Sequence, residues 1–267
     1  MRTALVTGAS TGIGEAVALR LVRNGWHVSA GVRREGDAPT GTQELQLDVT
    51  DPEQIAAAAA RVPELHGLVN NAGIALAAPL EFIPVDELRR QLEVNVIGQV
   101  AVTQAFLPKL RQTRGNIVFV GSIAGRSALP FLGAYAASKH ALEAISDSLR
   151  LEVEPFGIGV SIVEPGTIAT PIWTKSAAVA DQLRERMPAE LGALYGERIA
   201  AFRRIAARRG AKGASAEDVA RAVEEELNAA HPATRGLVGR DAKIRATIER
   251  LPDRLRDRVY RRILLGG

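Results

Sequence analysis

Tyr135 and Lys139 stand four residues apart in a stretch of helical sequence, and side chains of these types at this spacing can do chemistry. The run GAYAASKHALEAISDSL, Gly133 to Leu149, repeats alanine, leucine and isoleucine at helical intervals and meets no breaker before Pro155. Residues at i and i+4 share one helix face. Because a cation beside a phenol favours the phenolate, Lys139 would lower the pKa of Tyr135 from its usual ~10. The pair is a candidate proton donor with its partner, although such pairs more often only pack together.

A second motif, TGASTGIG (7–14), can bind phosphate, because it joins a strand-like run, RTALVT (2–7), to a helical pattern. Gly8 permits a tight turn, Gly12 lets the backbone approach a pyrophosphate, and Gly14 allows close packing of helix on strand. The N–H groups and the positive dipole end of the helix then suit an anion. A glycine-rich turn without a ligand is the alternative, but the strand–turn–helix context favours binding.

Composition excludes several classes of site. The 267 residues contain no cysteine, which rules out disulfides, thiolate metal sites and thiol nucleophiles. The histidines lie at scattered positions: His27, His66, His140 and His231. Without ligand spacing among them we expect no metal site. Apolar runs stay short of the ~18 residues of a membrane span, and the start MRTALVTGAS is typical of a strand and turn rather than a signal peptide. A cytoplasmic protein is expected.

Basic residues concentrate toward the C-terminus. From Arg198 to Gly267 there are 17 Lys/Arg and 9 Asp/Glu, a net charge of +8, whereas the whole chain carries +4. A basic tail can bind nucleic acid or an anionic membrane. Here acidic residues alternate with the arginines and few aromatic side chains are present to stack on bases, which favours a solvated helical surface. We therefore expect no nucleic-acid partner.

Strand-like and helix-like segments alternate along the chain. Apolar, β-rich runs predict strands at 2–7, 26–32, 44–49, 65–73, 117–122, 158–166 and 233–239. Helical patterns occupy 13–23, 52–61, 85–111 and 134–154, with Asp51 as a cap and with Pro108 expected to kink or interrupt the third helix. This alternation predicts an α/β fold with a doubly wound parallel sheet and helices on both faces. Since no repeat or linker is evident, residues 1–267 are expected to form a single domain.

Two segments extend beyond this sheet. Residues 171–213 form a connection long enough to carry its own helices and to act as a substrate lid. Residues 241–265 predict a helical C-terminal extension, divided near Pro252. Its two apolar faces are expected to consist of Ile244, Ile248 and Leu251, and of Leu255, Val259 and Ile263.

The glycine spacing Gly-x-x-x-Gly-x-Gly resembles the nucleotide turn, TGxxxGIG, of the short-chain dehydrogenase/reductase family in its single-domain form. Further motifs follow in the order of that family: Asn70-Asn71-Ala72-Gly73, Asn95 in NVIG, Ser122 in VGSIAG, Tyr135-x-x-x-Lys139, and Pro165-Gly166 with Thr170 beyond. The matches run from Thr7 to Thr170, about two-thirds of the chain. Each motif is modest alone, but all of them together and in order are highly specific.

The resemblance implies a Rossmann-like fold with a hydride-transfer site at the carboxyl ends of the strands. It implies that Tyr135 gives or takes the proton and that Lys139, besides lowering the pKa of Tyr135, holds the nicotinamide ribose. Ser122 would donate a hydrogen bond to the substrate oxygen, and Asn95 would anchor a water relay to the lysine. Taken alone, Ser122 could instead cap a turn, and Asn95 could be a buried polar group bonded to the backbone.

The same resemblance implies a set of cofactor-binding residues, in which Asp48 accepts from the adenine amino group. The set comprises Gly8, Ser10, Thr11, Gly12, Ile13, Gly14, Arg33, Arg34, Asp48, Val49, Asn70, Ala72, Gly73, Tyr135, Lys139, Pro165, Gly166, Ile168 and Thr170.

The second strand ends in GVRRE, and this ending bears on the choice of cofactor. NAD-preferring enzymes place a carboxylate there, but here Val32 is followed by Arg33 and Arg34. Arginine forks suit the 2′-phosphate of NADP, so NADP(H) is favoured over NAD(H), with Arg33 as the first choice because it is nearest the strand end. A solvated surface pair is the alternative.

These residues predict an oxidoreductase that transfers a hydride between NADP(H) and a carbonyl or secondary alcohol. A nucleotide-sensing regulator of the same fold would normally lack the Tyr, Lys or Ser, and a longer epimerase or dehydratase would have a different turn. Apolar residues expected at the pocket mouth favour a hydrophobic substrate: Ala124, Phe131, Ile168, Trp173, Met187, Leu191 and Tyr195. The resemblance also implies a symmetric homodimer or homotetramer, formed through the helices near 85–111 and 134–154.

Overall fold

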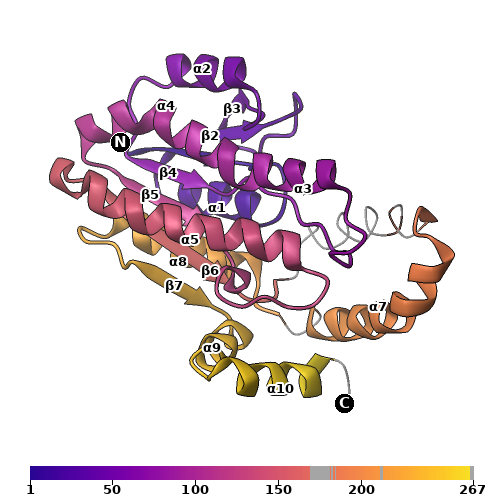
Figure 1. The fold of residues 1–267 in the computed structure, drawn as a ribbon. Coiled ribbons are helices and arrows are strands. Elements are labelled where there is room, and N and C mark those ends of the chain that lie inside the picture. Colours follow the sequence, from indigo (N-terminus) through magenta and orange to yellow (C-terminus); the bar gives the residue numbers. More distant parts are fainter. Residues whose placement is uncertain (169–180, 182, 184, 211–212, 265–267) are drawn as a thin grey trace.

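Seven parallel strands form one sheet in the computed structural model, which describes residues 1–168, 181, 183, 185–210 and 213–264. The strands are β1 (Thr3–Thr7), β2 (His27–Val32), β3 (Gln43–Gln46), β4 (Gly67–Asn70), β5 (Asn116–Val120), β6 (Gly159–Pro165) and β7 (Arg235–Val238). Their order, β3-β2-β1-β4-β5-β6-β7, reverses direction between β1 and β4, and every neighbouring pair is parallel (Figure 1). The predicted doubly wound α/β fold is confirmed.

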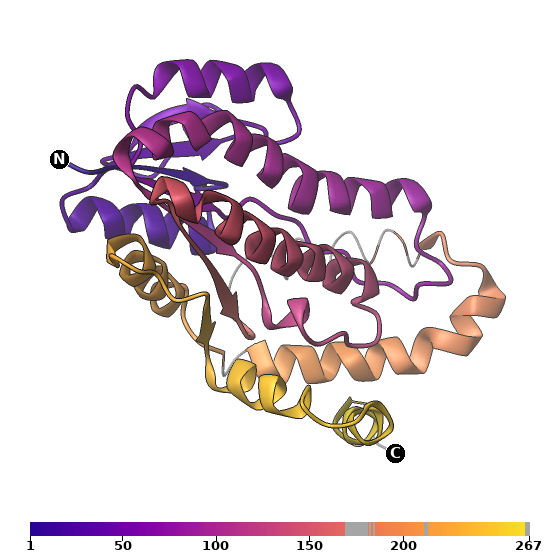
Figure 2. The same cartoon turned by 60° about the vertical axis from the view of Figure 1, so that its left-hand side comes forward.

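Helices cover both faces of the sheet (Figures 1 and 2). One face is packed by α1 (Gly12–Arg23) and α8 (Ala216–Asn228), and the other by α2 (Pro52–Arg61), α4 (Gly98–Thr113) and α5 (Gly133–Val153). Strand side chains alternate between the two resulting cores. In β5, Val118 and Val120 join the α1–α8 side, whereas Ile117 and Phe119 join the α4–α5 side.

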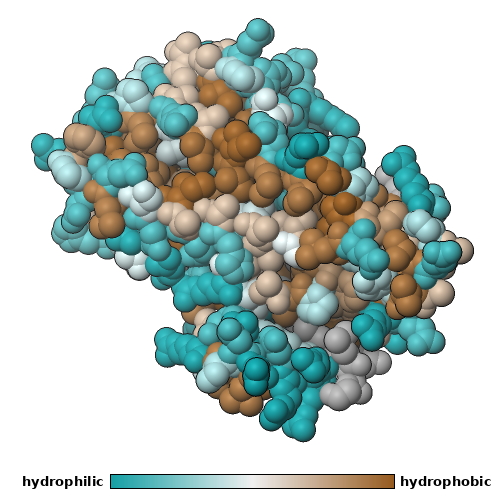
Figure 3. All heavy atoms as spheres, viewed as in Figure 1, coloured by the Kyte–Doolittle hydropathy of each residue, from teal (hydrophilic) through white to brown (hydrophobic). Residues whose placement is uncertain are grey.

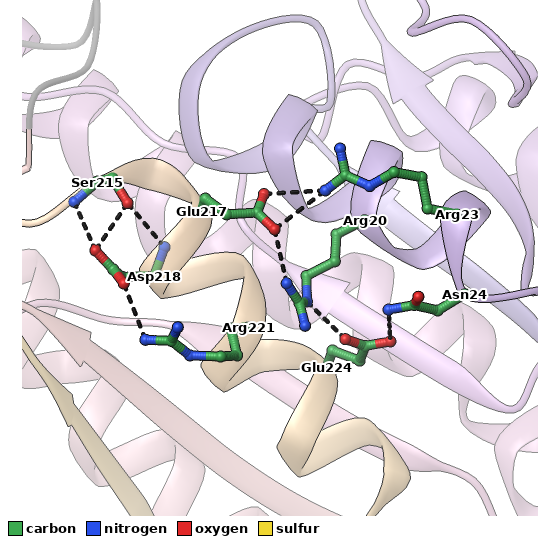
Figure 4. Close-up of polar contacts among 8 residues, drawn as sticks. All are labelled: Arg20, Arg23, Asn24, Ser215, Glu217, Asp218, Arg221 and Glu224. Atoms are coloured by element: carbon green, nitrogen blue, oxygen red, sulfur yellow. Dashed lines mark hydrogen bonds and ion pairs between the residues drawn. The ribbon is translucent and has the colours of Figure 1, made fainter.

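Ion pairs tie α1 to α8 across the surface of the first face (Figure 4). Arg20 lies 2.6 Å from both Glu217 and Glu224, and Arg23 lies 3.1 Å from Glu217. The α8 N-terminus carries a capping box, in which Ser215 and Asp218 exchange hydrogen bonds. Helices α1 and α8, which lie far apart in the sequence, are therefore joined by polar contacts as well as by their shared apolar core.

The long helix expected at 85–111 is interrupted, but not at Pro108. It consists of α3 (Val85–Leu92), a π-helical turn η1 (Glu93–Ile97) and α4, and Pro108 lies inside α4. The turn coincides with buried tertiary contacts of Asn95 to the backbone of Ile74, and π-turns of this kind are frequent at functional sites. The expected position was wrong because residue propensity does not report such contacts.

The C-terminal extension divides near Pro252 as expected, into α9 (Arg240–Ile248) and α10 (Asp253–Leu264). The expected apolar faces do not both pack on the body, because Ile244, Leu255 and Ile263 are 42–51% exposed. Polar contacts to Ser127 anchor the extension instead: the Tyr260 hydroxyl lies 2.9 Å from Ser127 Oγ, and Arg245 donates to the same residue.

Helix α7 (Ala189–Gly210) projects beyond the sheet (Figures 1 and 2). It belongs to the segment 171–213 expected to be a lid, of which 171–180, 182, 184, 211 and 212 lie outside the described residues. Hydrophobic side chains gather on the surface along α4 and α5, while the surface of α9 and α10 is mostly hydrophilic (Figure 3). Within the described ranges, no helix is long and apolar enough to cross a membrane.

Candidate active site

A cavity of about 530 Å³ opens where the strands end at their carboxyl edge. Each neighbouring strand sends a residue into its wall: Gly8 after β1, Arg33 after β2, Asn71 after β4, Ser122 after β5 and Gly166 after β6. In open parallel sheets, this edge and the point where the strand order reverses form the usual crevice for a ligand. The cavity therefore lies where the topology places a binding site.

The glycine turn forms one end of the cavity with its backbone. Gly8 and Gly12 adopt φ values of +65° and +66°, a region that disfavours other residues. A Cβ on Gly14 would lie 2.3 Å from the Gly8 carbonyl oxygen and 2.5 Å from Asn71 Nδ2, so no side chain fits there. In the described structure the N-cap Thr11 makes no side-chain capping bond, which leaves the first N–H groups of α1 for an anion.

Asn71 holds this turn in place, and Asn70 does not. Asn71 Nδ2 donates to the carbonyl oxygens of Thr7 and Gly8 at 2.9 and 3.2 Å, and Asn71 lines the cavity. Asn70, the last residue of β4, points to the opposite side and donates to Thr103 Oγ1 at 2.8 Å. Of the two asparagines, the sequence-based set contained only Asn70, whereas the cavity wall contains Asn71.

The residues expected to bind the adenosine part of the cofactor also divide into those that line the cavity and one that does not. Arg33, Asp48 and Val49 line the cavity, while Arg34 is absent from its described wall. Asp48 Oδ1 accepts from the N–H and the hydroxyl of Thr50, which fixes its orientation. Of the remaining predicted set, Ser10, Thr11, Ile13, Ala72, Gly73, Pro165 and Ile168 also line it, Gly14 packs behind the turn, and Thr170 lies outside the described residues.

Three charged residues in the wall were missed by sequence reasoning. Arg89 and Arg90 come from α3, and Glu93 begins the π-turn. They lie in an amphipathic stretch whose charged face is typical of a solvated helix surface. Sequence periodicity alone does not reveal which neighbour this charged face is directed toward.

Ser122, Tyr135 and Lys139 meet in the cavity wall, and each is less than a tenth exposed. One N–H of the Lys139 ammonium donates to the Val120 carbonyl oxygen at 2.8 Å, and Lys139 Nζ lies 5.8 Å from the centre of the Tyr135 ring. Ser122 Oγ also accepts from the N–H of Ala124 at 3.1 Å. The turn-capping contact considered for Ser122 is therefore present together with its place in the cavity.

The pKa of Tyr135 shifts in the direction opposite to the expected one. Burial raises it above the ordinary value, while a hydrogen bond with Ser122 and the charge of Arg245 lower it less strongly. Burial also lowers the pKa of Lys139 to about 8. Burial of the phenol therefore outweighs the effect expected from the lysine, and burial cannot be read from the i, i+4 spacing.

Asn95 lies behind the wall. Its Oδ1 accepts from the Ile74 N–H at 2.8 Å, and its Nδ2 donates to the Ile74 carbonyl oxygen and to Ser138 Oγ at 2.9 and 3.0 Å. These bonds join the loop after Gly73 to α5 one residue before Lys139. Asn95 is therefore a buried amide whose side chain is fully bonded to Ile74 and Ser138, and its role as the anchor of a water relay stays a prediction.

Of the apolar residues expected at the cavity mouth, Ile168 lines the cavity, whereas the described wall contains none of the other described ones. Phe131, with a φ of +67°, makes edge-on contacts with Tyr195 and Phe202, at centroid distances of 6.4 and 5.6 Å. Ala124 clusters with Tyr135, Ile168 lines the cavity, and Met187 and Leu191 are half-buried. Trp173 lies outside the described residues.

Comparisons with known proteins agree with this geometry. A family model described as "short chain dehydrogenase" matches residues 2–180. The chain is 33% identical to an NADPH-dependent 3-dehydrocapnine reductase of Ornithobacterium rhinotracheale, over 97% of this chain and 96% of that one. It is 38% identical to retinol dehydrogenase 5 of Mus musculus, over 90% and 81% of the respective chains. A solved short chain dehydrogenase from Burkholderia cenocepacia J2315 in complex with NADP has a TM-score of 0.76 at 27% identity, covering 99% of each chain.

Proposed function

Since the chain belongs to the short-chain dehydrogenase/reductase family of oxidoreductases, we propose that it transfers a hydride between NADP(H) and a hydrophobic carbonyl or secondary alcohol. The observation that carries the proposal is the convergence of Ser122, Tyr135 and Lys139 in one buried wall of a cavity whose far end is the glycine turn. A proton donor, an oxygen-binding hydroxyl and a nucleotide-sized cleft are the groups that carbonyl reduction requires.

The residues present fit a dinucleotide. The positive φ values at Gly8 and Gly12, the open N-terminus of α1 and the absence of room for a Cβ at Gly14 together make a backbone cradle for a pyrophosphate. Asp48, Val49 and Ala72 would hold the adenosine end, and Pro165, Gly166 and Ile168 would border the nicotinamide end. When bound, the nicotinamide supplies or accepts the hydride.

Tyr135 is the proposed general acid in the direction of reduction. Its hydroxyl would give a proton to the substrate oxygen, and the raised pKa keeps that proton on the phenol at neutral pH until the oxygen gains charge. Ser122 would donate a second hydrogen bond to the same oxygen. Lys139, with one of its three N–H groups used on Val120, has donors left for the ribose hydroxyls, and Asn95 would hold α5 in place through Ser138.

We propose a preference for NADP(H) over NAD(H) on the basis of Arg33. It lies in the cavity wall directly after β2, where an acidic residue would bind ribose hydroxyls and repel a phosphate. The named NADPH dependence of one relative and the NADP in one solved relative support NADP use. Arg34, outside the described wall, is the weaker candidate.

The substrate is proposed to be apolar next to its reacting group. The mouth residues Ala124, Phe131 and Ile168 are apolar, and α7 with the rest of 171–213 is proposed as its lid. One relative is named a retinol dehydrogenase, which acts on an apolar alcohol. Residues 1–267 as one domain, a cytoplasmic location, and a homodimer or homotetramer through the α3–α4 and α5 surfaces complete the proposal.

A spectrophotometric screen tests the proposed function. The protein is incubated with NADPH or NADH and a panel of apolar ketones and aldehydes, and loss of absorbance by the reduced cofactor is measured. Turnover of at least one apolar carbonyl, faster with NADPH, is expected. NADPH binding by calorimetry without turnover of any compound would instead indicate a nucleotide-sensing regulator of the same fold.

A further inference from the structure

Two buried carboxylates, Glu143 and Glu164, lie in a group of charged side chains behind the cavity wall, whose other members are partly exposed. Glu143 and Asp147 come from α5, Glu164 from β6, Arg235 from β7, and Arg126 follows the short 3₁₀ turn after Ser122. The Glu164 side chain is fully buried, and Glu143 is 8% exposed. Charges in such a place destabilise a fold unless they are paired and hydrogen-bonded.

Most of these groups have an ion partner. Both carboxylate oxygens of Glu164 accept from Arg126, each at 2.5 Å. Arg235 donates to Glu143 Oε2 at 3.0 Å and to Asp147 at 2.5 Å. Glu143 Oε1 is the exception: it is buried and accepts no hydrogen bond from the described residues, and the Glu143 carboxyl group lies next to that of Glu164.

Two ionised carboxylates in this contact would repel each other, and Oε1 would remain an unsatisfied buried acceptor. A proton on Glu143 Oε1 removes both problems, because the acid then donates to Glu164 while Oε2 still accepts from Arg235. We propose that Glu143 is protonated in the folded protein at pH 6 and donates through Oε1 to Glu164, and that this acid pair positions α5, β6 and the turn after Ser122 behind the cavity wall.

The pair joins segments that carry the candidate catalytic groups. Glu143 lies one helical turn after Lys139 on α5, and Glu164 lies two residues before Gly166. Arg126, which binds Glu164, lies four residues after Ser122. A Cβ on Gly125 would lie 3.1 Å from Glu143 Oε1 and 2.9 Å from the Lys139 carbonyl oxygen, so this turn packs closely against the pair. The catalytic consequence rests on the proposed function, but the protonation does not.

Burial and the neighbouring charges also favour the protonated form of Glu143. Burial and the adjacent Glu164 raise the pKa of Glu143 from 4.5 to about 7, and Arg235 opposes the shift. The charged groups facing it are Lys139 and Asp147 on α5, Glu164 on β6, Arg235 on β7 and, through Glu164, Arg126. Since the folded-state pKa is above the unfolded one, the stability contributed by the proton is full below the unfolded value and is lost as the pH rises through about 7.

Proton release on unfolding tests the protonation directly. Calorimetric unfolding at pH 6 in two buffers of different ionisation enthalpy measures the protons released. Glu143→Gln keeps a donor for Glu164 and an acceptor for Arg235 but cannot titrate, so the wild type should release about one more proton per chain than this variant. Glu152→Gln, an exposed change on the same helix, should release as many as the wild type. Equal release by wild type and Glu143→Gln would overturn the proposal.

A spectroscopic measurement keeps the test valid if Glu143→Gln fails to fold. The wild type should show an infrared carbonyl band of a protonated carboxyl group at pH 6 that disappears with a midpoint near pH 7. No such titrating band would contradict the proposal.

Activity profiles test the positioning role separately. The wild-type kcat/KM should break near pH 7, and Glu143→Gln should lack that break. Glu143→Leu, which cannot donate, should lower kcat/KM about tenfold at both pH 6 and pH 8. Identical profiles for all three proteins would leave the pair without a positioning role. Absence of turnover on every substrate would refute the proposed function while the proton count still decides the protonation.

Discussion

One end of the cavity is formed by backbone atoms, and the other is proposed to be formed by side chains. The nucleotide end is formed by the backbone of the turn from Gly8 to Gly14, seven residues of continuous sequence fixed by Asn71. The mouth is proposed to be formed by side chains such as Phe131 and Tyr195, which lie 64 positions apart and contact each other edge-on. A backbone site needs one conformation and tolerates few residues, whereas a side-chain site can exchange residues. The first end can therefore be shared by enzymes that differ at the second.

The largest effect is expected from filling the backbone end. Gly14→Ala would place a methyl group 2.3 Å from the Gly8 carbonyl oxygen, so the turn must open, and NADPH affinity should fall at least a hundredfold by calorimetry. Gly192→Ala in α7 is the matched control, because its Cβ meets nothing within 4 Å. That change should leave NADPH affinity intact and raise the unfolding free energy by about 1 kcal/mol. Equal NADPH affinities of the two variants would remove the distinction between the ends.

The second-largest effect is expected from the loss of the proposed proton donor, Tyr135, which lies between the two ends of the cavity. Tyr135→Phe keeps the ring and its packing but removes the hydroxyl, so kcat should fall roughly 10²–10⁴-fold while the Kd for NADPH stays within about twofold. Tyr195→Phe at the mouth is the control, because its hydroxyl bonds Glu81 in an exposed position. Wild-type rates from the Tyr135→Phe protein would refute the assignment of the general acid.

This contrast also explains how much the sequence could predict. The strand–turn–helix at 7–14 and the Tyr135–Lys139 spacing are local patterns, and the sheet that positions them follows from the alternation of strands and helices. Strand ends agree with the predicted ones or differ by up to three residues, as for β3, which ends at Gln46 rather than Val49. A strand or helix whose apolar residues recur with a period of 2 or 3.6 can therefore be predicted from its own segment of sequence.

Features that depend on contacts between distant segments were not predictable. The π-turn at Glu93–Ile97, in which Asn95 bonds the backbone of Ile74, and the place of Arg89 in the cavity wall could not be foreseen. The raised pKa of Tyr135 is due to burial, which spacing does not reveal. The pairing of Glu143 with Glu164 could not be predicted either, because the two residues lie 21 positions apart in the chain.

Arg33 contributes a side chain to the nucleotide end of the cavity, which is otherwise formed by backbone. Its substitution is expected to have an intermediate effect on cofactor binding. Arg33→Ala should raise the KM for NADPH about ten- to a hundredfold and leave that for NADH nearly unchanged, because a charge-assisted bond contributes roughly 1.5–3 kcal/mol. Since Arg33 is exposed, the change should lie near the lower limit, and added salt should erode it. Arg34→Ala, a change just outside the described wall, is the control. Equal wild-type use of both cofactors, unchanged by Arg33→Ala, would make Arg33 only a surface charge.

The smallest effect is expected at the mouth, where side chains can substitute for one another. Phe131→Leu removes the edge-on contacts to Tyr195 and Phe202 but keeps an apolar side chain, so the KM for a bulky apolar substrate should rise a few-fold. The kcat and the Kd for NADPH should stay constant, because the lost contact is the same in the ground state and the transition state and lies away from the glycine turn. Phe156→Leu, at an exposed ring that contacts Arg111, is the control and should change neither constant. If Phe131→Leu lowers kcat as strongly as Tyr135→Phe does, the mouth takes part in catalysis, and the two ends of the cavity do not divide binding from chemistry as proposed.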